Sequence, residues 1–206
     1  MADFAAQVSQ YSLSEFAEAD GGLGWRFDAS RAAVLVHDLL PYYVGMLPVA
    51  TQQDLVRQCG RVVDSARARG LPILASAPRA ETTVQQRGLG GRLWGLGPSS
   101  AQAAAHCLPG LDKPEVPWIR KRSLSAFFAT DLDVELRRQG RDQLILVGVF
   151  ASQGIVATSF DALARDLEVF LIADAVADYS RDLHSLAVDQ VARSTGQVIT
   201  TTEFVA

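Results

Sequence analysis

The chain has 206 residues, of which 49% are hydrophobic and 20% are charged, and its formal net charge is −4. These values are typical of one globular domain with a substantial core. The mild acidity and the lack of a Lys/Arg block argue against a nucleic-acid partner. No apolar stretch approaches the ~20 residues that span a bilayer, and residues 1–10 lack the features of a secretory signal. With only two cysteines, we expect a cytoplasmic protein with no membrane partner and no disulfide scaffold.

Apolar runs alternate with helical patterns along the chain. Residues 1–30 are expected to form an N-terminal helical arm, with a helix at Ser12–Asp20 and a break at Gly21–Gly24. Strands are predicted at 32–36, 71–77, 117–121, 143–150, 168–173 and 197–201. Helices are predicted at 51–70, with Thr51 as N-cap and Cys59 in the core, at 131–139, at 151–165 and between the last two strands. This order favours a single domain over residues 1–206: a doubly wound, mostly parallel α/β sheet of six strands with helices on both faces.

The first buried strand ends in Asp38, a carboxylate at the point where the strand opens into a loop. Ligands of open α/β sheets bind at the carboxyl ends of the strands, so Asp38 is a candidate site residue. The alternative is that Asp38 caps the next turn or pairs with a base on the surface.

Two bases and a helix start fall at the same predicted edge. Arg87 lies in the long loop after the second strand, Lys121 ends the third strand, and Phe150–Gly154 follows the fourth. One acid and two bases converging on one pocket would suit a small anionic substrate. Each base taken singly is more often a solvated surface charge.

Several common motifs are absent from the sequence. It has no G-x-G-x-x-G after a strand, no P-loop and no G-x-S-x-G elbow. Its three histidines, His37, His106 and His184, lack the spacing of metal ligands. His37 adjoins Asp38, but neighbouring strand residues point to opposite faces, so we interpret His37 as a packed or hydrogen-bonded structural residue.

Motifs in matching order resemble the isochorismatase-like hydrolases, in particular the isochorismatases of phenazine and siderophore biosynthesis. The resemblance runs from about Arg31 to Thr202 and rests on VLVHDLL, QQRGL…LWGLGP, KRSLSAFFATDLDVELRRQGRDQLILVGVF, GVFASQGIVATSFDA and LIADAVADYS. Many members of this superfamily are cysteine hydrolases, but the position of their nucleophile is Gly154 here. The resemblance instead implies an enol-ether hydrolase that forms no acyl-enzyme, binds no metal or cofactor and acts as a homodimer.

The implied reaction is hydrolysis of the enolpyruvyl ether of isochorismate or 2-amino-2-deoxyisochorismate to pyruvate, in secondary metabolism. The resemblance assigns catalysis to Asp38 and Lys121, and substrate binding to Arg87. Asp38 would be the general acid, with a pKa raised by burial and opposed by Lys121 while no substrate is bound. We also expect substrate contacts from Tyr42, Trp94, Phe150, Ala151 and Gly154, including backbone N–H groups near Ala151–Gly154 that orient the substrate.

The chain departs from these isochorismatases at the walls of the site. Pro78 stands where they have a substrate-contacting glutamine, and Phe150 where they have a tyrosine. Loss of buried polar contacts changes specificity. We interpret Arg79 and Arg122 as surface charges, with compensation for the lost contacts as the alternative. Two alternatives follow: a divergent member acting on a related cyclic acid, or a catalytically silent binding subunit.

Overall fold

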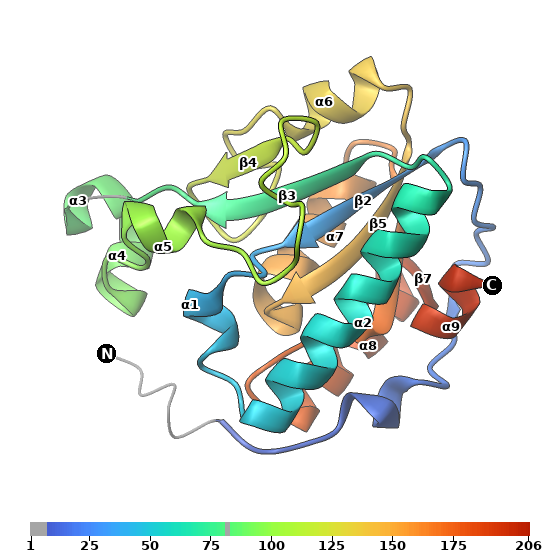
Figure 1. Cartoon of the computed structure of the whole chain (residues 1–206), viewed down its shortest axis with the longest axis horizontal. Coiled ribbons are helices and arrows are strands. Elements are labelled where there is room, and N and C mark those ends of the chain that lie inside the picture. The colour runs from blue at the N-terminus through green and yellow to red at the C-terminus, as the bar shows by residue number, and fades with distance from the viewer. Residues whose placement is uncertain (1–7, 81–82) are drawn as a thin grey trace.

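The computed structural model describes residues 8–80 and 83–206, and these form a sheet of seven strands (Figure 1). The spatial order is β1-β7-β6-β5-β2-β3-β4, and all neighbours are parallel except β1 and β7. The strands are β1 (Gly21–Gly22), β2 (Ala32–His37), β3 (Ile73–Pro78), β4 (Trp118–Lys121), β5 (Gln143–Val149), β6 (Glu168–Ala177) and β7 (Gly196–Ile199).

The six predicted strands are all present, but the prediction of six in total is wrong. The additional strand, β1, falls where the sequence suggested a break. It pairs antiparallel with β7, Gly21 lying opposite Val198. A Cβ at Gly22 would lie 2.5 Å from the Gly196 carbonyl oxygen, so only glycine permits this approach.

Helices lie against the sheet, with α2 in front of it and α7 and α8 behind it in Figure 1. None of the helices within the described residues is both long and apolar enough to cross a membrane. The helices are α1 (Pro41–Val44), α2 (Val49–Ala68), α3 (Val84–Arg87), α4 (Leu89–Trp94), α5 (Ser100–Ala104), α6 (Leu132–Arg138), α7 (Val156–Leu163), α8 (Arg181–Ser194) and α9 (Thr201–Val205), with a 3-10 turn η2 (Leu13–Phe16) and a π-helical turn η3 (Ala151–Ile155).

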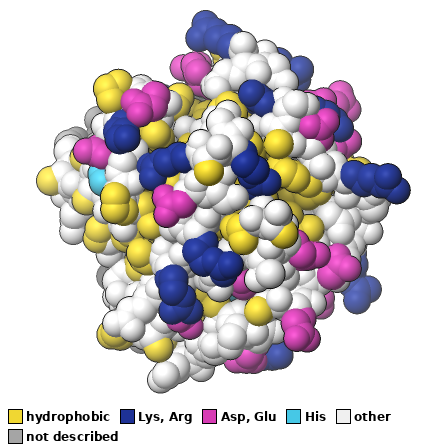
Figure 2. Space-filling model, turned by 45° about the vertical axis from the view of Figure 1, so that its right-hand side comes forward, with side chains coloured by type: hydrophobic (Ala, Val, Ile, Leu, Met, Phe, Trp, Pro, Cys, Tyr) yellow, Lys and Arg dark blue, Asp and Glu magenta, His cyan; other side chains and the backbone are white. Residues whose placement is uncertain are grey.

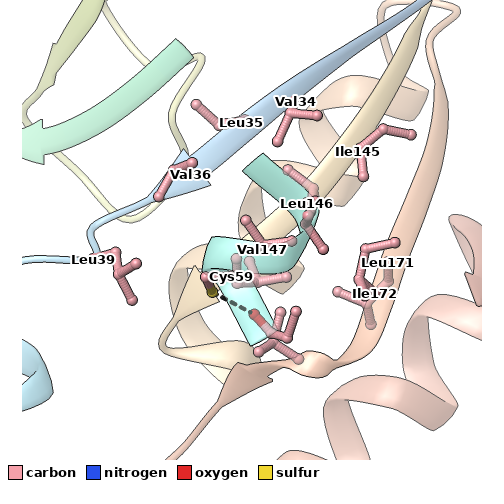
Figure 3. Packing of buried hydrophobic residues seen from close by; sticks show 14 of the residues in the cluster. Val34, Leu35, Val36, Leu39, Cys59, Ile145, Leu146, Val147, Leu171 and Ile172 are labelled. Carbon is pink, nitrogen blue, oxygen red and sulfur yellow. Dashed lines mark hydrogen bonds between the residues drawn. The ribbon is translucent and has the colours of Figure 1, made fainter. Parts of the chain in front are cut away.

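Hydrophobic core residues cover both faces of the central strands, and Figure 3 shows some of those packed near α2. Every residue of β2 and β5 is buried, as expected for strands covered on both faces. Cys59 of α2 is fully buried and donates its thiol hydrogen to the Ala175 carbonyl oxygen at 3.2 Å, which confirms its interpretation as a core residue. The prediction of Thr51 as N-cap is wrong, because α2 begins at Val49 and the Thr51 hydroxyl bonds to the Tyr11 carbonyl oxygen.

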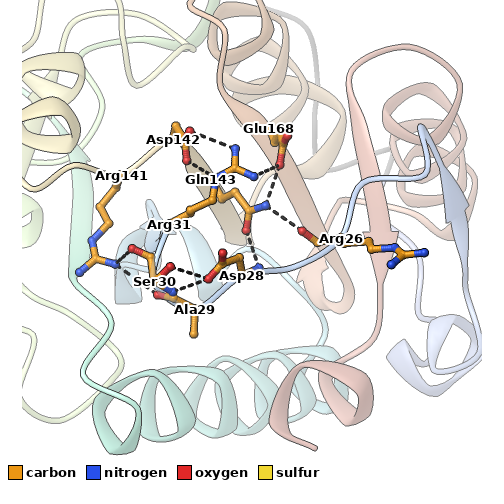
Figure 4. Close-up of polar contacts among 9 residues, drawn as sticks. All are labelled: Arg26, Asp28, Ala29, Ser30, Arg31, Arg141, Asp142, Gln143 and Glu168. Carbon is orange, nitrogen blue, oxygen red and sulfur yellow. Dashed lines mark hydrogen bonds and ion pairs between the residues drawn. The ribbon is translucent and has the colours of Figure 1, made fainter.

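The amino ends of the central strands carry a polar cluster (Figure 4). The buried Gln143 side chain accepts from the Asp28 N–H and donates to the Arg26 carbonyl oxygen, each at 2.8 Å. Arg31 pairs with Asp142 at 2.8 Å and Glu168 at 3.3 Å. These contacts attach the segment before β2 to β5 and β6, at the end of the sheet opposite Asp38.

The N-terminal arm packs on the body, but its helix is shorter than predicted. Residues 1–7 of the predicted arm lie outside the described residues. The Ser12–Asp20 helix reduces to η2, whose capping box joins Ser12 and Glu15. The Tyr11 side chain is buried, and its hydroxyl lies 3.0 Å from Nδ1 of His184 and accepts from the Asp178 N–H at 2.9 Å. The arm therefore reaches the carboxyl end of β6.

Charged side chains of both signs are interspersed on the face drawn in Figure 2. Apolar side chains lie between them. This face therefore carries no extended field of one sign.

Candidate active site

Asp38 stands where the order of strands reverses. From β2 the chain proceeds outward to β3 and β4, then returns to place β5 on the other side of β2 and continues to β6 and β7. The carboxyl ends of β2 and β5 therefore flank the crevice in which sheets of this kind bind ligands. Asp38 leaves β2 in a left-handed conformation, with φ +50°, which is uncommon for a residue other than glycine.

A buried ion pair forms the centre of the site. Asp38 Oδ2 lies 2.7 Å from Lys121 Nζ, and both side chains are less than a tenth exposed. Asp38 Oδ1 accepts a hydrogen bond of 2.8 Å from the Ser76 hydroxyl, whose oxygen lies 3.2 Å from the Asp38 N–H. Lys121 also donates to the carbonyl oxygens of Ser123 and Leu124, each at 3.2 Å. The prediction that Asp38 and Lys121 meet at the sheet edge is confirmed.

The electrostatics of Asp38 differ from the prediction. Burial raises the pKa of the Asp38 carboxyl, but the nearby Lys121 ammonium, together with His37 and the Ser76 hydroxyl, outweighs burial. The pKa of Asp38 therefore lies below its usual value, and the expectation of a raised pKa is wrong for the substrate-free protein. Asp38 is a carboxylate at neutral pH.

His37 is neutral and fixed between β2 and β5. Burial is the main cause that lowers the pKa of His37 to about 4. Its Nδ1 lies 2.8 Å from the Val149 carbonyl oxygen, and because a carbonyl only accepts, Nδ1 carries the proton. The structural interpretation of His37 is confirmed, but its predicted separation from Asp38 is not. Nδ1 lies 3.9 Å from Asp38 Oδ2, since the left-handed φ of Asp38 ends the strand alternation.

Arg87 ends the short helix α3. Its Nη1 atom is buried and has no hydrogen-bond partner within the described part of the chain. Gly97 packs against this guanidinium so closely that a Cβ would clash with it. Burial is the main cause that raises the pKa of the Tyr43 hydroxyl, and the negative charge of Asp38 raises it further. The positive charge of Arg87 and its hydrogen bond to Tyr43 act in the opposite direction. Tyr43 thus connects Arg87 with the ion pair.

Aromatic rings line the site next to Asp38. The Phe150 ring stacks on Tyr179 at a centroid distance of 4.2 Å and meets the edge of Tyr43 at 5.8 Å. Tyr42 packs edge-on against Tyr43 at 5.1 Å. Of the two tyrosines, Tyr43 is the one that faces Phe150, so the wall includes a tyrosine that the sequence analysis did not select. A substrate role for Tyr42 stays a prediction.

The turn after β5 offers fewer free N–H groups than expected. The Ser152 N–H donates to the buried Asp178 carboxylate at 2.6 Å, and the Gln153 N–H lies 3.3 Å from the Phe150 carbonyl oxygen. Burial raises the pKa of Asp178. These two N–H groups are therefore occupied, which limits the predicted anion site around Ala151 and Gly154.

Trp94, at the end of α4, is 36% exposed, and its contact with a substrate stays a prediction. Within residues 8–80 and 83–206, no three His, Cys, Asp or Glu side chains are grouped so that they would hold a metal ion.

Most of the chain is similar in sequence to known proteins. The sequence pattern that defines the isochorismatase domain matches residues 32–203. The chain belongs to the isochorismatase family. The phenazine biosynthesis protein PhzD of Pseudomonas fluorescens is 37% identical over 182 residues, which cover 88% of each chain. Enterobactin synthase component B of Escherichia coli K12 is 32% identical over 186 residues, covering 87% of this chain and 64% of that protein.

The isochorismatase fold is also found in solved structures. A cysteine hydrolase from Pseudomonas syringae pv. phaseolicola superposes with a TM-score of 0.76 at 21% identity, covering 91% of this chain and 96% of that one. The resemblance in the sequence motifs and the α/β fold expected from it are thereby confirmed.

Sequence reasoning missed three contributors to this site. Ser76 is a single polar residue in an apolar strand, two positions before the strand ends, and that position was its only signal. Tyr43 was not distinguishable from Tyr42 without the turn of α1. Asp178 follows the ten-residue strand β6, which was predicted to end at Ala173.

Proposed function

We propose that this chain hydrolyses the enolpyruvyl ether of isochorismate or 2-amino-2-deoxyisochorismate to pyruvate and a dihydro-hydroxybenzoate or dihydro-anthranilate product. The observation that carries the proposal is the buried Asp38–Lys121 pair at the strand reversal. The proposal includes a cytoplasmic, single-domain homodimer that needs neither metal nor cofactor. The family relationship to PhzD and enterobactin synthase component B supports it.

The chemistry begins with a proton from Asp38. Its carboxyl group protonates the terminal methylene carbon of the enol ether, which forms a C–H bond and an oxocarbenium ion. Water attacks this ion and returns a proton to the Asp38 carboxylate. The hemiketal then collapses: the bond between the pyruvyl carbon and the ether oxygen breaks, the proton of the hemiketal hydroxyl is transferred to that oxygen, the ring keeps it as a hydroxyl group, and pyruvate leaves.

Substrate binding supplies the protonation state that this step requires. In the free protein Asp38 is ionised because of Lys121. A substrate carboxylate that binds Lys121 weakens this stabilisation and adds negative charge, and both effects raise the pKa of Asp38. Arg87 binds a second carboxylate in bidentate fashion through its guanidinium group. The proposal therefore requires a substrate that is itself an anion.

An altered substrate is the second candidate, and the site walls favour it. Pro78 lies opposite Lys121 in the β3–β4 register, and a proline side chain offers no hydrogen bond there. Phe150 presents a bare ring at the neighbouring wall. A related cyclic acid that lacks the corresponding polar group would fit such walls better.

The test measures pyruvate. Purified protein is incubated separately with isochorismate and with 2-amino-2-deoxyisochorismate, and pyruvate is followed against the spontaneous rate. Release with either compound is the expected result and identifies the preferred ring substituent. Folded protein that releases pyruvate from neither would contradict the proposal and favour a different cyclic acid.

Tyr43 gives a prediction within this function. Removal of its hydroxyl in Tyr43→Phe leaves Arg87 without that partner, so kcat/KM for pyruvate release is expected to fall roughly 10- to 100-fold, the value of one hydrogen bond to a charged group. Tyr42→Phe removes the neighbouring hydroxyl and tests the predicted substrate contact of Tyr42 in the same assay. An unchanged kcat/KM in Tyr43→Phe would contradict a role for the Tyr43 hydroxyl. Steady-state kinetics decide between them.

A further inference from the structure

Gly154 faces the imidazole of His37 with no room for a side chain. A Cβ at position 154 would lie 2.3 Å from His37 Cε1, 3.1 Å from Nε2 and 3.2 Å from Nδ1. Non-bonded carbon atoms are in contact at about 3.5–4.0 Å. The ring has nowhere to go, because it is completely buried and its Nδ1–H is bonded to the Val149 carbonyl oxygen. His37 and Gly154 are therefore a sterically matched pair.

Position 154 matters because Asp38 lies beside the same ring. His37 Nδ1 is 3.9 Å from Asp38 Oδ2, and Asp38 is paired with Lys121. Gly154 lies in η3, which opens the helix after β5. A nucleophile at the start of a helix beside an acid–base pair is an arrangement suited to acyl transfer. The same fold carries a protein described as a cysteine hydrolase.

We propose that His37 is the specificity-determining residue that keeps a nucleophilic side chain out of position 154 and so reserves the site for attack by water. The identity of the reaction rests on the proposed function. The exclusion itself is a property of the two residues and is measured without a substrate. Failure of pyruvate release would therefore count against the proposed function alone, whereas independence of positions 37 and 154 would count against this inference alone.

Asparagine is the informative replacement for His37. Its side-chain amide supplies an N–H donor near the position of Nδ1, so the bond to the Val149 carbonyl oxygen is retained. It lacks Cε1 and Nε2, two of the three atoms that a Cβ at 154 would meet. His37→Asn thus removes most of the obstruction and keeps the hydrogen bond.

The first experiment is a double-mutant cycle on Tm. Gly154→Ala is expected to lower the Tm of the otherwise unchanged protein by about 5 °C or more, because overpacking in a closed core is costly. In the His37→Asn background the same substitution is expected to lower Tm by less than about half as much. Gly60→Ala is the control, since a Cβ at that helical glycine meets only Leu108 at 3.7 Å. Equal shifts from Gly154→Ala in both backgrounds would overturn the proposal.

The second experiment asks whether relief of the clash admits a nucleophile. The His37→Asn/Gly154→Cys variant is treated with p-nitrophenyl acetate; the introduced thiolate attacks the ester carbonyl, p-nitrophenolate leaves, and a thioester remains. Peptide mass spectrometry is expected to find acetylation at position 154 at least ten times faster than at Cys107. Burial raises the pKa of Cys107 to about 11, which makes it the internal reference. Acetylation at position 154 no faster than at Cys107 would also overturn the proposal.

Discussion

Asp38→Asn is expected to lower pyruvate release by a factor of about 10²–10⁴, the usual contribution of a positioned general acid. The amide has almost the same shape as the carboxyl group and its oxygen still accepts from the Ser76 hydroxyl, which supports the fold even though the buried Lys121 ammonium loses its counter-ion. It has no acidic proton to give to the methylene carbon. Initial rates of pyruvate release, with circular dichroism to check folding, make the comparison.

Asp64→Asn controls for the loss of one negative charge elsewhere. The Asp64 side chain is 78% exposed on α2, and its partner Arg67 lies 3.5 Å away. We expect this variant to keep the wild-type rate, because an exposed pair of this kind contributes little. A fully active Asp38→Asn protein would show that the proton comes from another group.

Lys121→Met is expected to lower the free energy of unfolding at pH 7 by about 3–5 kcal/mol, since it leaves a buried carboxylate without its counter-ion. Asp38 would lose the ammonium at 2.7 Å and keep the burial that raises its pKa. Methionine fills most of the volume of the lysine stem, so loss of packing is a smaller part of the effect. Urea unfolding at fixed pH measures the change.

The contribution of Asp38 to the pH dependence of stability is expected to reverse sign in Lys121→Met. In the wild-type protein the folded pKa of Asp38 is lowered, so its contribution is present above the unfolded pKa of about 4 and is lost as pH falls through the folded pKa. In Lys121→Met the folded pKa is raised above the unfolded value. The contribution of Asp38 to the free energy of unfolding is then greatest at low pH and declines as pH rises above about 4. Asp38→Asn/Lys121→Met, with no carboxyl group, should lack this dependence; a Lys121→Met protein that is more stable at pH 7 than at pH 5 would contradict the argument.

The central strands and the ion pair were predictable because their signals are local. The apolar run of β2 lacks alternation, which marks a strand covered on both faces, and Asp38 interrupts it at its carboxyl end. Lys121 ends another strand in the same way. In parallel strands such positions share one edge of the sheet, so sequence alone brought the two residues to the same region.

The remaining features depend on contacts that a linear pattern does not contain. The two glycines of β1 carry no side-chain pattern, and their pairing is set by β7. The lowered pKa of Asp38 depends on a distance of 2.7 Å to Lys121, since burial alone would have produced the opposite shift. The choice between Tyr42 and Tyr43 depends on the direction in which the short helix α1 presents each ring.

The placement of β5 beside β2 has a consequence for biosynthesis. His37 and Val149, which are hydrogen-bonded, are 112 residues apart in the chain, and Tyr11 and Asp178 are 167 apart. A nascent chain that has left the ribosome only as far as Lys121 carries both charges of the pair but lacks β5, the strand that pairs with one edge of β2. Closing such long loops precedes the contacts that reward it. Premature termination before β5 therefore abolishes the whole site, and the unpaired apolar edge of β2 becomes a target for chaperones and proteases.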